Sequence, residues 1–375
     1  RESDLRIRLE LLEEGCRNEA LVDRSAVRRV LELSALWERR LKPGRERPAD
    51  ADTVGLLLAL AYPDRIGRRR PGATTQFLLS NGRGAFLPAE DPLAASDYLV
   101  AAELDGDRRE ARIFLAAPIS EASLEDVFAD QIETEAVVAW DRREQAVLAR
   151  RRRRLHSLIL RDDPLERPDS VAALAALLEG IRTEGLQILP WDAAAESLRA
   201  RVRFLRGIEG AEAWPDFADD ALLERIEDWL GSHVEGMMRR SQLRQLDLRR
   251  ILEAQLDWRQ KRRLEEGAPT HLTVPSGSRI AIDYAGETPV LAVRLQEMFG
   301  QTETPRVAWG KVPVLVQLLS PAGRPVQVTR DLASFWKNGY AAVRADLRGR
   351  YPKHFWPDDP LTAPPIRRVR PRHSG

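Results

Sequence analysis

The sequence has a single cysteine in 375 residues, which restricts its chemistry. Cys16 has no second cysteine for an internal disulfide, and a zinc site built on cysteines is excluded. Long apolar runs are also missing, because the stretch LLLALA at 56–61 falls far short of the roughly 20 residues that cross a bilayer. No basic and apolar leader opens the sequence, so nothing predicts export or a membrane partner. We therefore expect a cytoplasmic protein.

An excess of charge of one sign is missing as well. The chain has 59 Lys and Arg against 58 Asp and Glu, a formal net charge of +1. A global basic field therefore does not attract a polyanion, and any nucleic-acid contact has to come from local patches. Apolar residues make up 43% of the chain, which is ample for buried cores. The length indicates two or three domains of roughly 150 residues each.

The motifs of a nucleotide-binding site are not found. A P-loop needs a glycine-rich turn followed by Lys and Ser or Thr before a helix. The Gly310–Lys311 pair instead leads through Val312 and Pro313 into a strand, without a hydroxyl for magnesium. The NGRG turn at 81–84 is typical of a hairpin connection rather than of a dinucleotide site.

Metal and nucleophilic sites have little support. No two histidines have the spacing of metal ligands on a helix. The five are His156, His233, His271, His354 and His373. The PSGSR stretch at 275–279 resembles a GxSxG nucleophile elbow only superficially, and a turn between two strands explains it better.

The densest set of reactive side chains is RGRYPKHFWPDDP at 348–360. His354 with Asp358 and Asp359 offers an acid/base pair. Aromatics between prolines are, however, typical of a strap packed on the protein's own surface, and Asp-Asp-Pro is typical of a turn. We favour the strap, with catalysis and nucleic-acid contact as the alternatives.

The periodicity of the sequence predicts a multidomain α+β chain of three regions. Residues 1–65 are helical, and the stretch at 24–41 has an amphipathic stripe. Residues 66–165 alternate short β runs with Gly, Asn and Asp turns, which indicates an OB-like β-barrel of about five strands. Residues 166–375 form a mixed α/β C-terminal extension, helical to about 267 and then mixed α+β.

Some elements are predicted individually. The runs EAVVAW and QAVLARRRRRLHSLILR supply the last strands of the barrel. A short helix at 123–132 interrupts the strands, with Ser123 as its cap. In the extension, one helix ends at Gly231 and a longer one runs from 241 to Gly267.

Basic residues gather in three patches: 68–70, 142–161 and 348–375. The second holds eight arginines and one acid, and five of these arginines run unbroken at 150–154. At most three of the five share one face of a strand, because side chains alternate. Lys and Arg neutralise phosphates, so the patches indicate contact with nucleic acid. The candidate binding residues are Arg68, Arg69, Arg70, Arg83, Arg150, Arg151, Arg153, Arg348, Arg350 and Lys353.

The sequence resembles the C-terminal region of bacterial HrpB-type ATP-dependent helicases, of the DEAH/RHA class. The matching stretches are THLTVPSGSRIAIDY, PVLAVRLQEMFG, GKVPVLVQLLSPAGRPVQVTRDLASFW and VRADLRGRYPKHFWPDDP. NGRGAFLPAEDPLAASDYLVAAEL and ARIFLAAPI resemble the barrel region of that family. The resemblance is specific and covers essentially the whole chain.

The resemblance implies a parent with two RecA-like motor domains and a winged helix, followed by a helical bundle, an OB-like domain and a family-specific extension. On this pattern residues 1–65 are the end of the helical bundle. No Walker A motif, DExH box or arginine-finger motif occurs in the sequence. ATP and Mg²⁺ are therefore expected in the motor domains of the parent, with no cofactor in this chain. The start at Arg1 rather than Met suggests a fragment of that parent.

We predict a non-catalytic C-terminal accessory region of an ATP-dependent RNA helicase, inactive by itself. Its expected partners are single-stranded nucleic acid, RNA in preference to DNA, and the helicase's own motor domains. The alternative is a module that docks a protein partner, with its surface on the Trp-rich helices at 219–231 and 331–347. A third hypothesis, a hydrolase centred on His354, is disfavoured.

Overall fold

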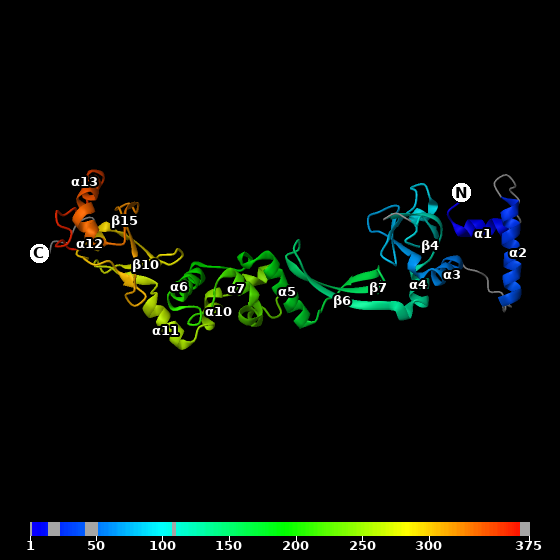
Figure 1. Cartoon of the computed structure of the whole chain (residues 1–375), viewed down its shortest axis with the longest axis horizontal. Coiled ribbons are helices and arrows are strands. Elements are labelled where there is room, and N and C mark those ends of the chain that lie inside the picture. The colour runs from blue at the N-terminus through cyan, green and yellow to red at the C-terminus, as the bar shows by residue number, and fades with distance from the viewer. Residues whose placement is uncertain (1, 14–22, 42–51, 107–109, 368–375) are drawn as a thin grey trace. The chain divides into compact units, whose positions relative to one another are not determined.

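The structure is a computed structural model (Figure 1). It describes residues 2–13, 23–41, 52–106 and 110–367. Cys16, His373 and the basic tail from Arg368 on lie outside the described residues. Within the described ranges, no helix has the length and apolar character needed to cross a membrane. The chain divides into two compact units, residues 1–138 with 148–168 and residues 139–147 with 169–375.

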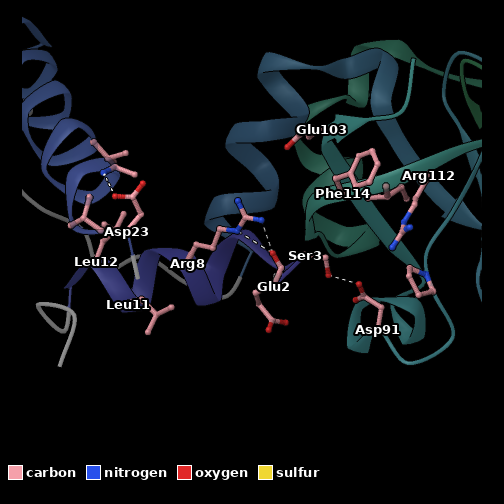
Figure 2. A pocket seen from close by; sticks show the side chains of 15 residues that line it. Glu2, Ser3, Arg8, Leu11, Leu12, Asp23, Asp91, Glu103, Arg112 and Phe114 are labelled. Atoms are coloured by element: carbon pink, nitrogen blue, oxygen red, sulfur yellow. Dashed lines mark hydrogen bonds between the residues drawn. The ribbon is translucent and has the colours of Figure 1, made fainter. Parts of the chain in front are cut away.

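In the first unit, the described residues up to 61 form three helices. They are α1 (Leu5–Glu13), α2 (Arg24–Leu41) and α3 (Thr53–Ala61). α3 packs closely on the strands that follow, because a Cβ at Gly55 would lie only 2.1 Å from the Pro118 carbonyl oxygen. α2 is amphipathic as predicted, yet none of its residues is buried. Both α1 and α2 border a cavity of about 970 Å³ beside the strand residues Arg112 and Phe114 (Figure 2).

A closed five-stranded barrel forms the centre of the first unit. Its strands are β1 (Ile66–Arg69), β2 (Gln76–Leu79), β3 (Gly84–Phe86), β4 (Tyr98–Leu104) and β5 (Glu110–Pro118), in the order β1-β2-β3-β5-β4. Only β3 and β5 run parallel. Phe77, Leu99 and Ile113 are buried inside, and each burial contributes about 1.5–3 kcal/mol. The closure and strand order are consistent with an OB-like barrel.

The strands predicted as the last two of the barrel lie outside it. β6 (Ile132–Asp141), β7 (Ala146–Leu155) and β8 (Leu158–Pro164) form a separate three-stranded sheet. The prediction was wrong because β4 pairs with both β1 and β5, which closes the barrel by residue 118. The predicted short helix is α4 (Glu121–Val127), and its cap is Ser120 rather than Ser123, since the Ser120 hydroxyl accepts from the Ser123 amide at 3.1 Å.

Residues 170–267 of the second unit fold into short helices. They are α5 (Ser170–Glu184), α6 (Ala193–Glu209), α7 (Asp219–Glu224), α8 (Ile226–Leu230), α9 (Arg240–Leu243), α10 (Leu248–Ala254) and α11 (Trp258–Gly267). The long helix predicted from 241 divides into three. Asp247 and Asp257 start new helices there, because their side chains accept from the amides of Arg250 and Gln260.

A five-stranded sheet of order β15-β14-β11-β10-β9 follows the helices. Its strands are β9 (His271–Thr273), β10 (Arg279–Asp283), β11 (Val290–Arg294), β14 (Leu315–Leu319) and β15 (Pro325–Thr329). The mixed α+β character expected after 267 is seen here, with β10 paired to β9 and a β14–β15 hairpin that turns at the PAGR stretch, residues 321–324. The chain then continues into α12 (Leu332–Ser334), a π-helical turn (Phe335–Gly339) and α13 (Tyr340–Arg350).

The strap predicted at 348–360 begins only after α13, because residues 348–350 are the last turn of that helix. Trp356 is buried and donates its indole N–H to the Tyr351 carbonyl at 2.9 Å. The Tyr340 hydroxyl donates to the Pro357 carbonyl and the Gln296 amide to the Phe355 carbonyl, both at 2.9 Å. The strap is thus held through its backbone carbonyls by α13 and by the 3-10 turn Leu295–Met298 that follows β11.

A short hairpin of β12 (Arg306–Val307) and β13 (Val312–Pro313) carries a strained turn. Ala308, Trp309 and Gly310 have φ of 50°, 54° and 81°. Left-handed backbone costs a bulky side chain about 1–3 kcal/mol. The turn persists because the Ala308 amide donates to the Gly267 carbonyl at 2.6 Å and Arg306 Nε donates to the Gly310 carbonyl at 2.6 Å.

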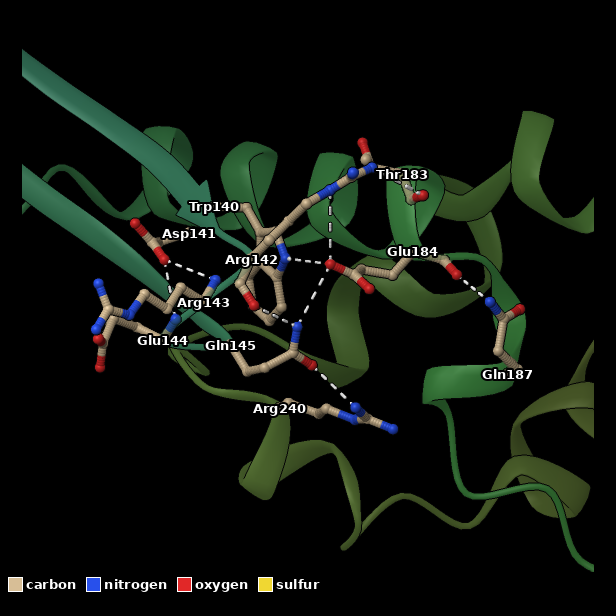
Figure 3. Close-up of polar contacts among 10 residues, drawn as sticks. All are labelled: Trp140, Asp141, Arg142, Arg143, Glu144, Gln145, Thr183, Glu184, Gln187 and Arg240. Atoms are coloured by element: carbon tan, nitrogen blue, oxygen red, sulfur yellow. Dashed lines mark hydrogen bonds and ion pairs between the residues drawn. The ribbon is translucent and has the colours of Figure 1, made fainter.

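The tip of the β6–β7 hairpin belongs to the second unit, and Glu184 of α5 organises it (Figure 3). Trp140 Nε1 and Gln145 Nε2 each donate to Glu184 Oε1 at 3.4 Å. Gln145 Oε1 accepts from Arg240 at 2.9 Å. The Trp140 ring also lies against Gly180, where a Cβ would be 2.4 Å from ring atom Cδ2. The hairpin tip is therefore fixed by both polar and steric contacts.

We expect Gly180→Ala to lower the free energy of unfolding of the second unit by about 1–3 kcal/mol, because the added methyl group displaces Trp140. Urea unfolding monitored by circular dichroism measures the change. Gly207→Ala is the matched control, since Gly207 is an exposed residue of α6 with no neighbour within 4 Å of its Cβ. That change should raise stability by about 0.5–1 kcal/mol. An equal gain from Gly180→Ala would contradict the steric role of Gly180.

Candidate nucleic-acid interface

Arg68 joins the first two predicted patches. Its guanidinium lies 5.9 Å from the centre of the Tyr98 ring and donates to the Ile159 carbonyl of β8. Burial raises the pKa of Tyr98 to about 12, so the hydroxyl stays neutral. The Arg68 side chain therefore reaches from β1 of the barrel to β8 of the neighbouring sheet.

The other arginines near the barrel also have partners. Arg69 pairs with Asp97, and Arg70 Nη1 lies 3.0 Å from Glu110 Oε1. Arg83 donates to the Gly106 carbonyl at 3.2 Å. These side chains are half-buried or exposed, so each ion pair contributes only about 0–1 kcal/mol. A phosphate can compete for such guanidiniums at little cost.

On β7, alternate arginines face opposite ways, as predicted. Arg150 and Arg152 converge on Asp162 of β8, whose Oδ1 lies 2.8 Å and 3.3 Å from their Nε atoms. Burial opposes the ionisation of Asp162, but the hydrogen bonds and charges of the two arginines outweigh it and lower the carboxyl pKa. This face of the sheet is therefore internally compensated.

The remaining arginines of the run have different environments. Arg153 pairs with Glu125 of α4, and Arg154 Nη1 lies 3.5 Å from Glu135 Oε1. Arg151 is exposed and has no partner among the residues that the structure describes. The sequence count of eight arginines to one acid thus overstates the local charge, because the carboxylates that compensate it come from α4, β6 and β8.

The third predicted patch lies in the second unit. Arg348 and Lys353 are exposed and make no ion pair within the described part of the chain, while Arg350 Nη2 lies 3.0 Å from Asp346 Oδ1. Nothing places these residues beside the arginines of the first unit. They are a separate candidate surface.

The cavity beside the barrel does not suit a polyanion. Carboxylates outnumber guanidiniums in its lining, which includes Glu2, Asp23, Asp91 and Glu103 against Arg8 and Arg112. Asp91 accepts from the Ser3 hydroxyl, and Arg8 donates to the Glu2 carbonyl at 2.7 Å and 3.0 Å (Figure 2). Phosphate binding is therefore disfavoured in this cavity.

The strap does not assemble an acid/base pair in the structure. Nδ1 of His354 is buried and has no hydrogen-bond partner within the described ranges. Asp358 instead pairs with Arg344, and Asp359 accepts from the Leu361 amide at 2.9 Å. The arrangement supports packing rather than hydrolysis.

Two exposed tryptophans of the second unit were not predicted as site residues. Trp258 is 68% exposed and Trp309 39% exposed, and arginines lie over both rings. By contrast, Trp229 and Trp336 of the Trp-rich helices are buried, so they do not form the predicted docking surface. One feature of the sequence indicates that Trp258 is exposed. It lies between Asp257 and a run of polar and charged residues, where the apolar stripe of the helix is interrupted.

Two family models match the chain. Residues 229–360 match HrpB_C, the ATP-dependent helicase C-terminal model, and residues 131–165 match the connector region of the ATP-dependent RNA helicase HrpB. The chain carries the C-terminal region of an HrpB-type helicase. The connector match coincides with the β6–β8 sheet, which the structure also separates from the barrel.

The HrpB-type region has close relatives in Escherichia coli. It is 41% identical over 325 residues to the ATP-dependent RNA helicase HrpB of strain K12, covering 86% of this chain and 40% of that protein. The crystal structure of the E. coli DExH-box NTPase HrpB matches with a TM-score of 0.53 and 38% identity, over 98% of this chain and 44% of that one. The chain thus spans less than half the length of these relatives.

His354 predicts a pH dependence of the strap. Burial, and then the charge of Arg294, lower the pKa of His354 below its usual value. As the pH falls through the ordinary histidine range, the unfolded chain takes up a proton more readily than the folded one, and stability is lost. The melting temperature of His354→Gln should therefore fall less between about pH 7.5 and about pH 5.5 than that of the wild type.

His233→Gln is the control, since it removes an exposed imidazole of the same unit. A pH-dependent loss for His354→Gln as large as that of the wild type would show that His354 is not buried in its neutral form.

Proposed function

We propose that the chain is a non-catalytic accessory region of an ATP-dependent RNA helicase that docks on the helicase's own motor domains and contacts single-stranded RNA. The observation that carries the proposal is the distribution of exposed apolar side chains. Of nineteen large exposed hydrophobic residues in the described ranges, twelve lie between Ile7 and Tyr62. They belong to α1, α2, α3 and the residue after α3.

Such exposure is unusual for a free surface. An amphipathic helix normally buries its apolar face, and soluble proteins rarely leave more than a few hundred Å² of contiguous apolar area uncovered. On α2, Leu31 is 49% exposed, Trp37 53% and Leu41 72%. This pattern supports a docking surface and fits the end of a helical bundle completed by another part of the helicase.

The contact with RNA is supported by the barrel and its arginines. OB-like barrels bind single strands through basic grooves and aromatic side chains. Arg151 is exposed and has no partner among the described residues, and the surface ion pairs of Arg69, Arg70 and Arg153 are weak enough for phosphate to replace. We assign ATP and Mg²⁺ to the motor domains, since no phosphate-binding loop occurs in this sequence.

The docking surface can be tested on α2. Leu31→Asn with Trp37→Asn should weaken binding to the separately expressed motor portion of the parent helicase roughly tenfold or more, since apolar burial is lost. Isothermal titration calorimetry measures the affinity. Arg28→Asn with Glu32→Asn changes the opposite, polar face of the helix and should leave binding within about twofold. Equal effects of both pairs would refute docking through the apolar face.

The RNA contact can be tested on β7. Replacing Arg151 and Arg153 with Ala should lower the affinity of the chain for single-stranded RNA several-fold and reduce the salt dependence of binding by about one unit of slope per lost phosphate contact. Fluorescence anisotropy across a salt series measures both. Arg324→Ala, an exposed arginine on the β14–β15 turn, is the control. Unchanged affinity would remove Arg151 and Arg153 from the interface.

A further inference from the structure

The helix α11 begins with a tryptophan that packs against nothing in the core. The helix buries Leu264 and Gly267, whereas Trp258 at its first position is 68% exposed. The Arg259 guanidinium lies 5.5 Å from the centre of the Trp258 ring. Large aromatic surface is therefore held in solvent beside a cation, which folding of this unit alone does not require.

A second tryptophan is held at the other end of the helix. Trp309 occupies the left-handed turn between β12 and β13, and its ring contacts Gly267, where a Cβ would lie 2.7 Å from ring atom Cζ2. The Arg263 guanidinium lies 4.8 Å and Lys311 Nζ 5.9 Å from the ring centre. The strained backbone thus positions an aromatic ring between two cations.

The two tryptophans belong to one row. Arg259 and Arg263 are four residues apart on α11 and so lie on the same side of the helix, about 6 Å apart along its axis. Trp258 adjoins the first of them and Trp309 the second. We call Trp258, Arg259, Arg263, Trp309 and Lys311 the aromatic–cation row.

The charges around the row favour an anionic ligand. Its nearby carboxylates are already engaged: Glu265 pairs with Arg201 at 2.6 Å, Glu266 with Arg262 at 2.9 Å, and Glu209 with Arg263. Asp257 caps α11. Arg259, Lys261 and Lys311 form no ion pair with any described residue. Unpaired positive charge therefore remains beside both rings.

We propose that the aromatic–cation row is a second binding site for single-stranded nucleic acid, with bases stacked on Trp258 and Trp309 and phosphates beside Arg259 and Lys311. Nucleic acid suits the row because every base has a π face that can stack on an exposed aromatic ring. An acidic peptide needs only the cations and makes no use of exposed rings. The inference rests on the proposed contact with single-stranded RNA and adds a site that is independent of the barrel arginines.

Anisotropy of a short fluorescein-labelled oligouridylate bound to the chain tests the row. Trp258→Ala should weaken binding roughly five- to hundredfold without changing its salt dependence, because a neutral stacking contact is lost. Trp258→Phe keeps an aromatic face and should restore most of the affinity. Val171→Ala removes an exposed apolar side chain of the same unit and is the control. Arg259→Ala with Lys311→Ala should instead reduce the salt dependence.

The outcomes separate this site from the barrel. One outcome is that Trp258→Ala leaves RNA binding unchanged while replacement of Arg151 and Arg153 weakens it. This outcome would overturn the row and leave the proposed function standing. No RNA binding by the wild type would overturn both the row and the proposed RNA contact, and would leave only the docking on the motor domains. Equal loss in Trp258→Ala and Trp258→Phe would exclude stacking, and binding of polyglutamate as tight as that of the oligouridylate would assign the row to an acidic peptide instead.

Discussion

Closure of the five-stranded barrel is the constraint on which the rest of the first unit depends. Once β4 pairs with β1 and with β5, every barrel strand has two neighbours and no edge remains. The chain that follows has to form its own sheet, β6–β8. That sheet then lies against the barrel at Arg68 and extends its hairpin tip to a separate anchor on Glu184. The connector thus follows from barrel closure.

The same tertiary arrangement determines the electrostatics. Five consecutive arginines would create a strongly positive strand by themselves, but Asp162, Glu125 and Glu135 are brought to them from other elements. Surface pairs of this kind stabilise the fold by only about 0–1 kcal/mol each. They therefore hold the paired arginines only weakly, and Arg151 forms no ion pair with any described residue.

The exposed aromatic and apolar side chains supply the other half of the functional picture. The exposed apolar side chains of α1–α3 are close together in the N-terminal part of the sequence. Such a concentration is typical of a surface that another domain covers. Trp258 and Trp309 lie outside that group of apolar side chains, and each has an arginine over its ring. Apolar stripes suit a protein neighbour, whereas separate rings among cations suit stacked bases.

By itself the sequence determined the kinds of element and the family. The stripe at 24–41, the short β runs of the barrel region and the strap from Tyr351 on follow from local periodicity and proline placement, which neighbouring residues fix. It did not determine which strands close the barrel, which acids neutralise the arginines, or which tryptophans stay in solvent. Trp229 is buried and Trp258 exposed, although both belong to charged helical stretches. Tertiary structure decided these points, because strand pairing, ion pairing and burial depend on residues distant in sequence.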